Sequence, residues 1–147
     1  MSKFRVCIAG GRDFNEQPRL FEKCDNILSS KHPDIVVVTG VAWGADAAGI
    51  NYAEARGYEI DPFPVLSDQW RIGKWMGHRR NEVMLKSCDA LISFWDGKSR
   101  GTEGGLKYAK KLGLLVREIN YQGDGKLHIR PNPYYKSEKF RRDYLKK

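Results

Sequence analysis

Short apolar runs alternate along the chain with longer stretches in which apolar residues recur every three or four positions. The apolar runs predict five strands, at residues 4–9, 35–38, 58–65, 90–95 and 114–119. The stretches with helical spacing predict helices at residues 18–30, 44–57, 79–87 and 101–112. Strands that alternate with helices form βαβ units with right-handed crossovers and a parallel sheet. We therefore predict an α/β fold, a three-layer Rossmann-like parallel sheet of about five strands with helices on both faces.

The length of the chain fits one domain followed by a tail. A chain of 147 residues is long enough for a single domain that buries about two thirds of its unfolded surface. We place a nucleotide-binding domain at residues 1–121 and a basic, aromatic C-terminal tail at residues 122–147. Between Lys126 and Lys147 there are eight basic residues and two acidic ones, so the tail carries most of the net charge of +8. The remainder is nearly neutral, which argues against a dedicated DNA-binding surface on the domain.

Two interpretations of the tail stay open. In the first, it is a solvated end whose aromatic residues dock against the body or a second subunit; these residues are Tyr134, Tyr135, Phe140 and Tyr144. In the second, its positive charge binds an acidic partner or nucleic acid.

The sequence argues against several classes of protein. No apolar run approaches the roughly 20 residues that a membrane span requires, and MSKFRVCIAG leads directly into a strand rather than through a signal peptide. We expect a cytoplasmic protein that does not contact membranes. Cys7, Cys24 and Cys88 have no spacing suited to zinc or to a disulfide framework, and no Ser-His-Asp pattern is present. We expect a site without a metal or cofactor and small, buried cysteines.

Three turns at the carboxyl ends of predicted strands carry the candidate site, because ligands of open parallel sheets bind at that edge. In the first turn, Gly10 and Gly11 permit a tight bend and Arg12 can pair bidentately with phosphate. The alternative is an ordinary strand-to-helix turn with a surface arginine. The turn lacks the third glycine of the GxGxxG motif, so it is not a dinucleotide fingerprint.

In the second turn a helix begins at once, so that its free N–H groups face the end of the strand. Thr39, Gly40 and Gly44 form this turn. Asp46, in the first helical turn, either compensates the helix dipole or accepts a hydrogen bond from a ribose hydroxyl. Trp43 either packs in the core or offers a platform for a base.

The third turn belongs to the segment from residue 77 to residue 113. Arg80 offers a forked set of donors to phosphate, and Asn81 can hold a base or a ribose through both its donor and its acceptor. After the next strand, Gly101 and Thr102 open a helix whose N–H groups and dipole suit an anion.

A long loop from residue 64 to residue 77 precedes this third turn and contains Trp70, Lys74 and Trp75. Loops of such length in a compact domain are often binding loops. In one interpretation the tryptophans stack on a base and Lys74 reaches a phosphate. In the other, the tryptophans anchor the loop to the core or to another subunit.

Four segments occur in a characteristic order. They are GGRDF, TGVAWGADAAGINYAEARG, the spaced set Trp70, Gly73, Lys74, Gly77, Arg80, Asn81 and Met84, and GTEGGLKYAKKLG. Together they resemble the SLOG superfamily of Rossmann-like nucleotide-binding domains, and most closely a small branch common in bacteria and phages. The resemblance covers about residues 4–119 and implies a homodimer or higher homo-oligomer that pairs through helices beside the site. The superfamily also includes DprA, whose glycine-rich segment is similar to residues 39–46.

The LOG phosphoribohydrolases of the same superfamily release a base from a nucleoside 5′-monophosphate. Arg80 matches an arginine of these enzymes, and Gly101-Thr102 matches the GT of their PGGxGTxxE motif. The catalytic glutamate of that motif would fall at Gly105. Glu103 is two positions away, about 200° around the helix axis, so it cannot take that place without a shifted turn. If the protein is an enzyme, Arg80 and Glu103 are the catalytic candidates.

We therefore expect the protein to bind a nucleotide or a nucleotide-derived ligand, such as a signalling molecule related to ADP-ribose, in a cleft at the carboxyl ends of the strands. Phosphate would meet the two glycine turns and Arg80, and ribose would meet Asn81 and Asp46. Two alternatives stay open. One is a LOG-like nucleoside 5′-monophosphate phosphoribohydrolase, and the other is nucleic-acid binding through the basic tail.

Overall fold

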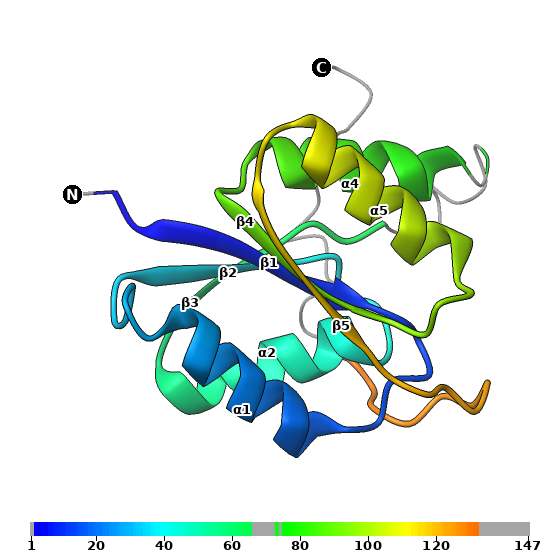
Figure 1. Cartoon of the computed structure of the whole chain (residues 1–147), viewed down its shortest axis with the longest axis horizontal. Helices are drawn as coiled ribbons and strands as arrows, with labels where there is room; N and C mark the ends of the chain where they lie inside the picture. The colour runs from blue at the N-terminus through cyan, green and yellow to red at the C-terminus, as the bar shows by residue number, and fades with distance from the viewer. Residues whose placement is uncertain (1, 66–72, 74, 133–147) are drawn as a thin grey trace.

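The computed structural model describes residues 2–65, 73 and 75–132. In this part of the chain, five parallel strands form one sheet in the order β3-β2-β1-β4-β5 (Figure 1). The strands are β1 (Phe4–Gly10), β2 (Ile35–Thr39), β3 (Glu59–Pro62), β4 (Ala90–Trp95) and β5 (Leu115–Asn120). The predicted parallel α/β sheet is confirmed.

Helices cover both faces of the sheet. Helices α1 (Gln17–Leu28) and α2 (Ala45–Arg56) pack on one face, and α4 (Trp75–Lys86) and α5 (Arg100–Lys111) pack on the other (Figure 1). Successive side chains of a strand point to opposite faces, so that β1 contributes Ile8 to the core under α1 and α2 and Cys7 to the core under α4 and α5. The three predicted layers are therefore present.

Strand β1 lies at the centre, and the chain changes its direction of winding there. From β1 the chain moves outward to β2 and β3, and it then returns to the other side of β1 to form β4 and β5. Strand β1 pairs with β2 over Phe4–Cys7 and with β4 over Val6–Gly10. The loops after β1 and β4 leave this edge toward opposite faces, which opens a crevice between them.

Helix α4 begins earlier than the sequence predicts. It starts at Trp75 rather than at Arg79. Met76 is fully buried and contributes to the same core as Met84, two helical turns further on. This long-range burial holds the first turn of the helix in a stretch whose glycines suggest a loop.

The predicted loop from residue 64 to residue 77 therefore ends before Trp75, whose side chain is exposed. Trp70 and Lys74, to which the sequence assigned binding or anchoring roles in this loop, lie outside the described residues. Strand β3 is also shorter than predicted and ends at Pro62, because its partner β2 ends at Thr39, the residue that pairs with Pro62.

Residues 121–131, which we call the strap, fold back over the body after β5. Tyr121 is buried, packs edge-on against Phe14 with ring centroids 5.2 Å apart, and donates a hydrogen bond to the carboxylate of Asp13. Further on, the N–H of Gly44 donates to the carbonyl of Ile129 at 2.9 Å. Packing against the body thus continues beyond residue 121, where the sequence suggested the end of the domain. The aromatic residues predicted to dock, 134, 135, 140 and 144, lie outside the described residues.

Cys7, Cys24 and Cys88 are buried and free, as predicted. Burial raises the pKa of the Cys24 thiol to about 12, so this thiol stays protonated and serves as a small core residue. Among the helices that the structure describes, none combines the length and the apolar character needed to span a bilayer.

Candidate functional site

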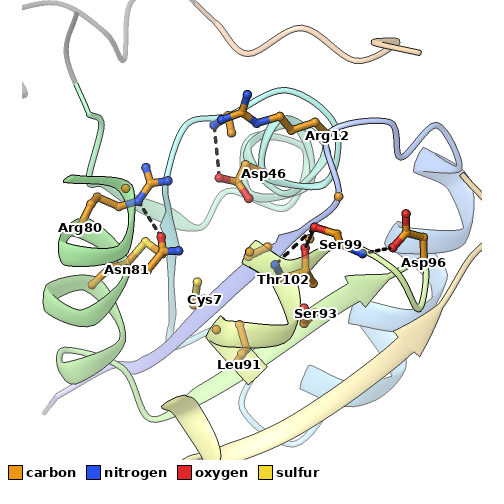
Figure 2. A pocket seen from close by; sticks show the side chains of 18 of the residues that line it. Cys7, Arg12, Asp46, Arg80, Asn81, Leu91, Ser93, Asp96, Ser99 and Thr102 are labelled. Carbon is orange, nitrogen blue, oxygen red and sulfur yellow. Dashed lines mark hydrogen bonds between the residues drawn. The ribbon is translucent and has the colours of Figure 1, made fainter. Parts of the chain in front are cut away.

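A cavity of about 590 Å³ opens at the carboxyl ends of β1 and β4, where the direction of winding changes. Figure 2 shows side chains from four sides of it: Arg12 and Asp46, Arg80 and Asn81 from α4, Ser99 and Thr102 at the start of α5, and Cys7, Leu91 and Ser93 from the sheet below. The volume lies within the range of small-molecule sites, and its place is where open α/β sheets bind their ligands.

The first wall is the turn after β1. Gly10 lies in the left-handed region at φ 153°, and a Cβ there would stand 2.2 Å from the carbonyl oxygen of Phe94. Only glycine therefore lets β1 and β4 approach so closely at the cavity. Arg12 follows directly, is exposed, and lines the opening. Its guanidinium group stays in contact with solvent and can pair with an anion that enters the cavity.

The second wall contains a buried carboxyl group. Asp46, in the first turn of α2, is 5% exposed and accepts a hydrogen bond from the N–H of Ala42 at 3.2 Å. Burial raises the pKa of Asp46, and the positive charges of Arg80 and Arg12 partly oppose this rise. A desolvated acid that lines a cavity is typical of functional sites rather than of stabilising ones.

The backbone before α2 is strained. Val41 has φ 59°, a left-handed conformation that a β-branched residue rarely adopts and that costs about 1–3 kcal/mol. Thr39 holds this turn by accepting a hydrogen bond from the Val41 N–H at 3.1 Å. Such strain persists only where the surroundings impose it, and it is concentrated at ligand sites.

Arg80 connects three parts of the fold. Its Nη1 donates to the carbonyl oxygens of Gly40, at 2.6 Å, and Phe63, at 3.1 Å, while its Nε donates to Oδ1 of Asn81 at 2.7 Å. A Cβ on Gly40 would stand 2.7 Å from Nη1, which explains the glycine. Arg80 therefore positions the ends of β2 and β3 against α4, as well as lining the cavity.

The third wall is the start of α5. Ser99 caps the helix by accepting from the Thr102 N–H at 3.5 Å and from the Thr102 hydroxyl at 3.2 Å. Asp96 accepts from the N–H groups of Ser99 and Lys98, and these bonds lower the pKa of its carboxyl group. Asp96 thus stays ionised and fixes the turn that aims the helix at the cavity.

The same helix presents an open cradle. Gly101 and Gly105 line the cavity, and a Cβ built on either would meet nothing within 4 Å among the described residues. The unpaired N–H groups of the first turn and the helix dipole point toward this space. The start of α5 can accommodate an anion without steric obstruction.

The structure brings together most of the residues that the sequence singled out. Those that line the cavity are Gly10, Gly11, Arg12, Asp46, Arg80, Asn81, Gly101 and Thr102. Those that are described and do not line it are Thr39, Gly40, Trp43, Gly44 and Glu103. Lys74 lies outside the described residues.

Several of the residues that do not line the cavity have structural roles. Gly44 has φ 82°, and a Cβ on it would stand 2.3 Å from the carbonyl oxygen of Gly11, so glycine is required for close packing. The guanidinium of Arg130 lies over the ring of Trp43, with Cζ 5.8 Å from the ring centroid. Gly105 lines the cavity and Glu103 does not, because residues two positions apart on a helix face different directions.

Sequence reasoning missed several lining residues. Ser93 and Asp96 come from the end of β4 and the turn after it, and Gly125 and Leu127 come from the strap. Ser99 could have been found, because a serine three residues before Thr102 is a helix-capping signal. The strap residues give no local signal, since their place depends on Asp13, more than a hundred residues away. Among the described residues, no group of three or more His, Cys, Asp or Glu side chains could hold a metal ion.

Solved structures with a similar fold include two DNA processing proteins. DprA from Streptococcus pneumoniae aligns with a TM-score of 0.62 and 16% identity over 80% of this chain. The match covers 50% of that protein, so this chain spans about half its length. DprA from Helicobacter pylori, whose structure was described for its single-stranded DNA binding mode, aligns with a TM-score of 0.51 and 17% identity, covering 86% of this chain and 69% of that one. These likenesses concern the fold.

Sequence relatives come from a phage and a prophage. The Gene 61 protein of Mycobacterium phage D29 is 30% identical in an alignment of length 122, and the match covers 80% of this chain and 95% of the relative. The SPbeta prophage-derived protein YoqJ of Bacillus subtilis (strain 168) is 29% identical in an alignment of length 128, and the match covers 77% of this chain and 73% of the relative. Residues 4–65 match the family described as the YspA, cpYpsA-related SLOG family. With the doubly wound sheet and the cavity at its switch point, these relationships show that the chain belongs to the SLOG superfamily, within the YspA, cpYpsA-related family.

Proposed function

We propose that the cavity binds a nucleotide or a nucleotide-derived ligand. The observation that carries this proposal is the convergence of Arg12, Arg80 and the open start of α5 on one cavity at the switch point of the sheet. Arginine side chains and a helix N-terminus are the groups that bind phosphate in α/β folds. The cavity volume of about 590 Å³ is sufficient for a nucleoside phosphate.

The phosphate lies at the start of α5 in this proposal. Gly101 and Gly105 leave room for it, and the first N–H groups of the helix point outward at this end. Arg12 approaches from the turn after β1 and supplies a solvent-exposed positive charge. The side chain of Arg80 is already held by two backbone carbonyls, so it contributes chiefly by its field and by positioning Asn81.

The ribose lies between Asp46 and Asn81. Oδ1 of Asn81 accepts from Arg80, which directs the amide nitrogen of Asn81 to other partners as a donor. Asp46 supplies a carboxyl oxygen that can accept from a ribose hydroxyl. Its buried position makes such a bond strong, because little water competes for it.

Replacing Arg12 tests the proposal without disturbing the fold. Because Arg12 is exposed and a hydrogen bond to a charged group contributes about 1.5–3 kcal/mol, Arg12→Ala should weaken binding of AMP or ADP-ribose by about ten- to a hundredfold. Isothermal titration calorimetry measures this change. Arg117→Ala is the matched control, since Arg117 is exposed on β5 and does not line the cavity.

Equal affinities in the wild-type protein and Arg12→Ala would show that the ligand's phosphate does not bind in this cavity. Arg80→Ala is a poorer test, because it also breaks the bonds that hold the ends of β2 and β3. A loss of binding in that variant could also result from displacement of the ends of β2 and β3.

The LOG-like phosphoribohydrolase is a less favoured alternative. Hydrolysis of the N-glycosidic bond needs a carboxylate near the ribose, and Glu103 does not line the cavity. Incubation with AMP followed by chromatography detects free adenine if the protein is an enzyme. Release that persists in Glu103→Ala and disappears in Asp46→Asn would assign the reaction to Asp46, whereas intact AMP supports a binding protein.

Nucleic-acid binding is the second candidate function. The net charge of +8 and the likeness to the DprA of Helicobacter pylori, which binds single-stranded DNA, favour it. Deletion of residues 133–147 leaves the strap in place and tests the basic tail alone. Salt-sensitive retention of single-stranded DNA that is lost in this deletion would support it. Light scattering at the same time tests the homodimer or higher homo-oligomer that we include in the proposal.

A further inference from the structure

The strap forms part of the cavity through one apolar side chain. Four large apolar side chains are strongly exposed in the described part of the chain: Trp75, Leu112, Leu115 and Leu127. Of these four, only Leu127 lines the cavity, although 55% of it remains exposed to solvent. An exposed apolar side chain in the lining of a cavity is available for contact with an apolar surface of a ligand.

Backbone and side-chain bonds hold Leu127 in this place from both sides. On the N-terminal side, the Gly125 N–H donates to Asp13 at 2.9 Å, and Asp13 also accepts from the hydroxyl of Tyr121. On the C-terminal side, the carbonyl of Ile129 accepts from the Gly44 N–H at 2.9 Å. The strap is therefore tied to the turn after β1 and to the start of α2.

The turn that carries Leu127 is also fixed internally. Asp124 accepts from the Lys126 N–H at 2.9 Å and pairs with Nε2 of His128 at 2.8 Å. These bonds lower the pKa of Asp124, the bond from the Lys126 N–H most strongly. The residues on each side of Leu127 are thus engaged by one carboxylate, and the leucine is presented by a defined turn. In Figure 1 the orange strap turns back from the end of β5 toward the start of α2.

The start of α5, which lines the same cavity, has the chemistry for phosphate. A ligand with a phosphate and a flat apolar group matches these two parts of the lining. The side chain of Leu127 offers methyl groups to the face of a base, whereas Arg12 and Asp46 suit the phosphate and the sugar between them.

We infer that Leu127 forms the wall on which the base of the bound nucleotide packs, so that the strap selects nucleosides over plain sugar phosphates. This inference rests on the proposed function and adds the orientation of the ligand. The contact is apolar and non-directional, so it favours the presence of a base without specifying which base is bound.

The experiment compares nucleoside 5′-monophosphates with ribose 5-phosphate, which lacks the base. Calorimetric titrations use AMP, GMP, CMP and UMP as probes, with the wild-type protein, Leu127→Ala, Leu127→Met and Leu115→Ala. Leu127→Ala should weaken binding of a nucleoside monophosphate by about tenfold, the loss expected when a contact of this apolar area is removed. Its affinity for ribose 5-phosphate should change by less than about twofold, because that ligand has no base to pack on Leu127.

The two remaining variants separate a contact from a structural effect. Leu127→Met keeps an apolar wall and should bind within about twofold of the wild type. Leu115→Ala removes an equally exposed leucine that does not line the cavity, and its affinities should not change.

The outcomes of these titrations separate the proposed contact at Leu127 from the proposed nucleotide-binding function. If Leu127→Ala binds nucleotides with wild-type affinity while Arg12→Ala binds them more weakly, the base does not pack on Leu127. The proposed phosphate site is then still supported. Equal weakening for AMP and ribose 5-phosphate would also overturn the inference, because it would show that the leucine supports the fold of the strap. If the wild type binds neither the four nucleotides nor ADP-ribose, both the proposed function and this inference fail.

Discussion

At the scale of single residues, the fold shifts the pKa values of two carboxyl groups near the site in opposite directions. Asp96 is half-buried and accepts two backbone hydrogen bonds, which lower the pKa of its carboxyl group. Asp46 is buried, and burial raises the pKa of its carboxyl group. The first carboxylate stabilises the folded chain, and the second is kept at a cost in stability that a ligand-binding role explains.

This contrast predicts opposite effects of replacing each aspartate by asparagine. The raised pKa of Asp46 means that the folded state loses stability as pH rises above the ordinary value of 3.8, and that the loss levels off above the raised folded-state pKa. Asp46→Asn cannot ionise, so its melting temperature minus that of the wild type should increase between pH 4 and pH 7. Circular dichroism at both pH values measures this difference.

The control has the opposite sign. The lowered pKa of Asp96 means that its contribution is present above 3.8 and is lost as pH falls through the folded-state pKa. Asp96→Asn should therefore lower the melting temperature by a similar amount at pH 7 and pH 4, and by less once the pH falls below 3.8 toward the folded-state pKa. A difference for Asp46→Asn that is the same at both pH values would show that burial does not disfavour its charge.

At the scale of elements, the strands and helices were predictable because their signals are local. Ile35–Thr39 is a continuous apolar run, and the helical spacing around Leu106 and Ala109 places α5 within a residue of its observed bounds. The start of α4 was not predictable, because it depends on burial of Met76 in a distant core. The order of Gly105 and Glu103 around α5 followed from helix geometry alone, and the cavity agrees with it.

The strap is the element that sequence reasoning could not place, and it makes a prediction at its own scale. Tyr121→Phe keeps the ring against Phe14 but removes the donor to Asp13. Loss of a hydrogen bond to a charged group should cost about 1–3 kcal/mol. Because Gly125 is tied to the same carboxylate, its amide should exchange with solvent about five- to a hundredfold faster if the loss is confined to the strap.

Hydrogen exchange followed by NMR measures this effect residue by residue. The control is Tyr108→Phe, since Tyr108 packs on the other core, under α4 and α5. Unchanged exchange at Gly125 in Tyr121→Phe would show that Asp13 does not hold the strap through its tyrosine.

At the scale of the whole molecule, the cavity lies where otherwise separate parts of the fold meet. Helix α2 belongs to one core, helices α4 and α5 belong to the other, and the strap comes from beyond the last strand. A ligand that contacts Asp46, Asn81, Thr102 and Leu127 would bridge both faces of the sheet. Because the unfolded chain lacks this arrangement, binding should stabilise the entire domain rather than one loop.

The size of this effect follows from linkage. A nucleotide at one hundred times its dissociation constant should add about 2.7 kcal/mol to the free energy of unfolding, which corresponds to roughly 8 °C in melting temperature for a chain of this length. Differential scanning calorimetry with AMP measures it, and Arg12→Ala at the same ligand concentration should show a much smaller rise. A rise of the same size in both proteins would place the stabilising contact outside the cavity, because Arg12 touches no other candidate site among the described residues.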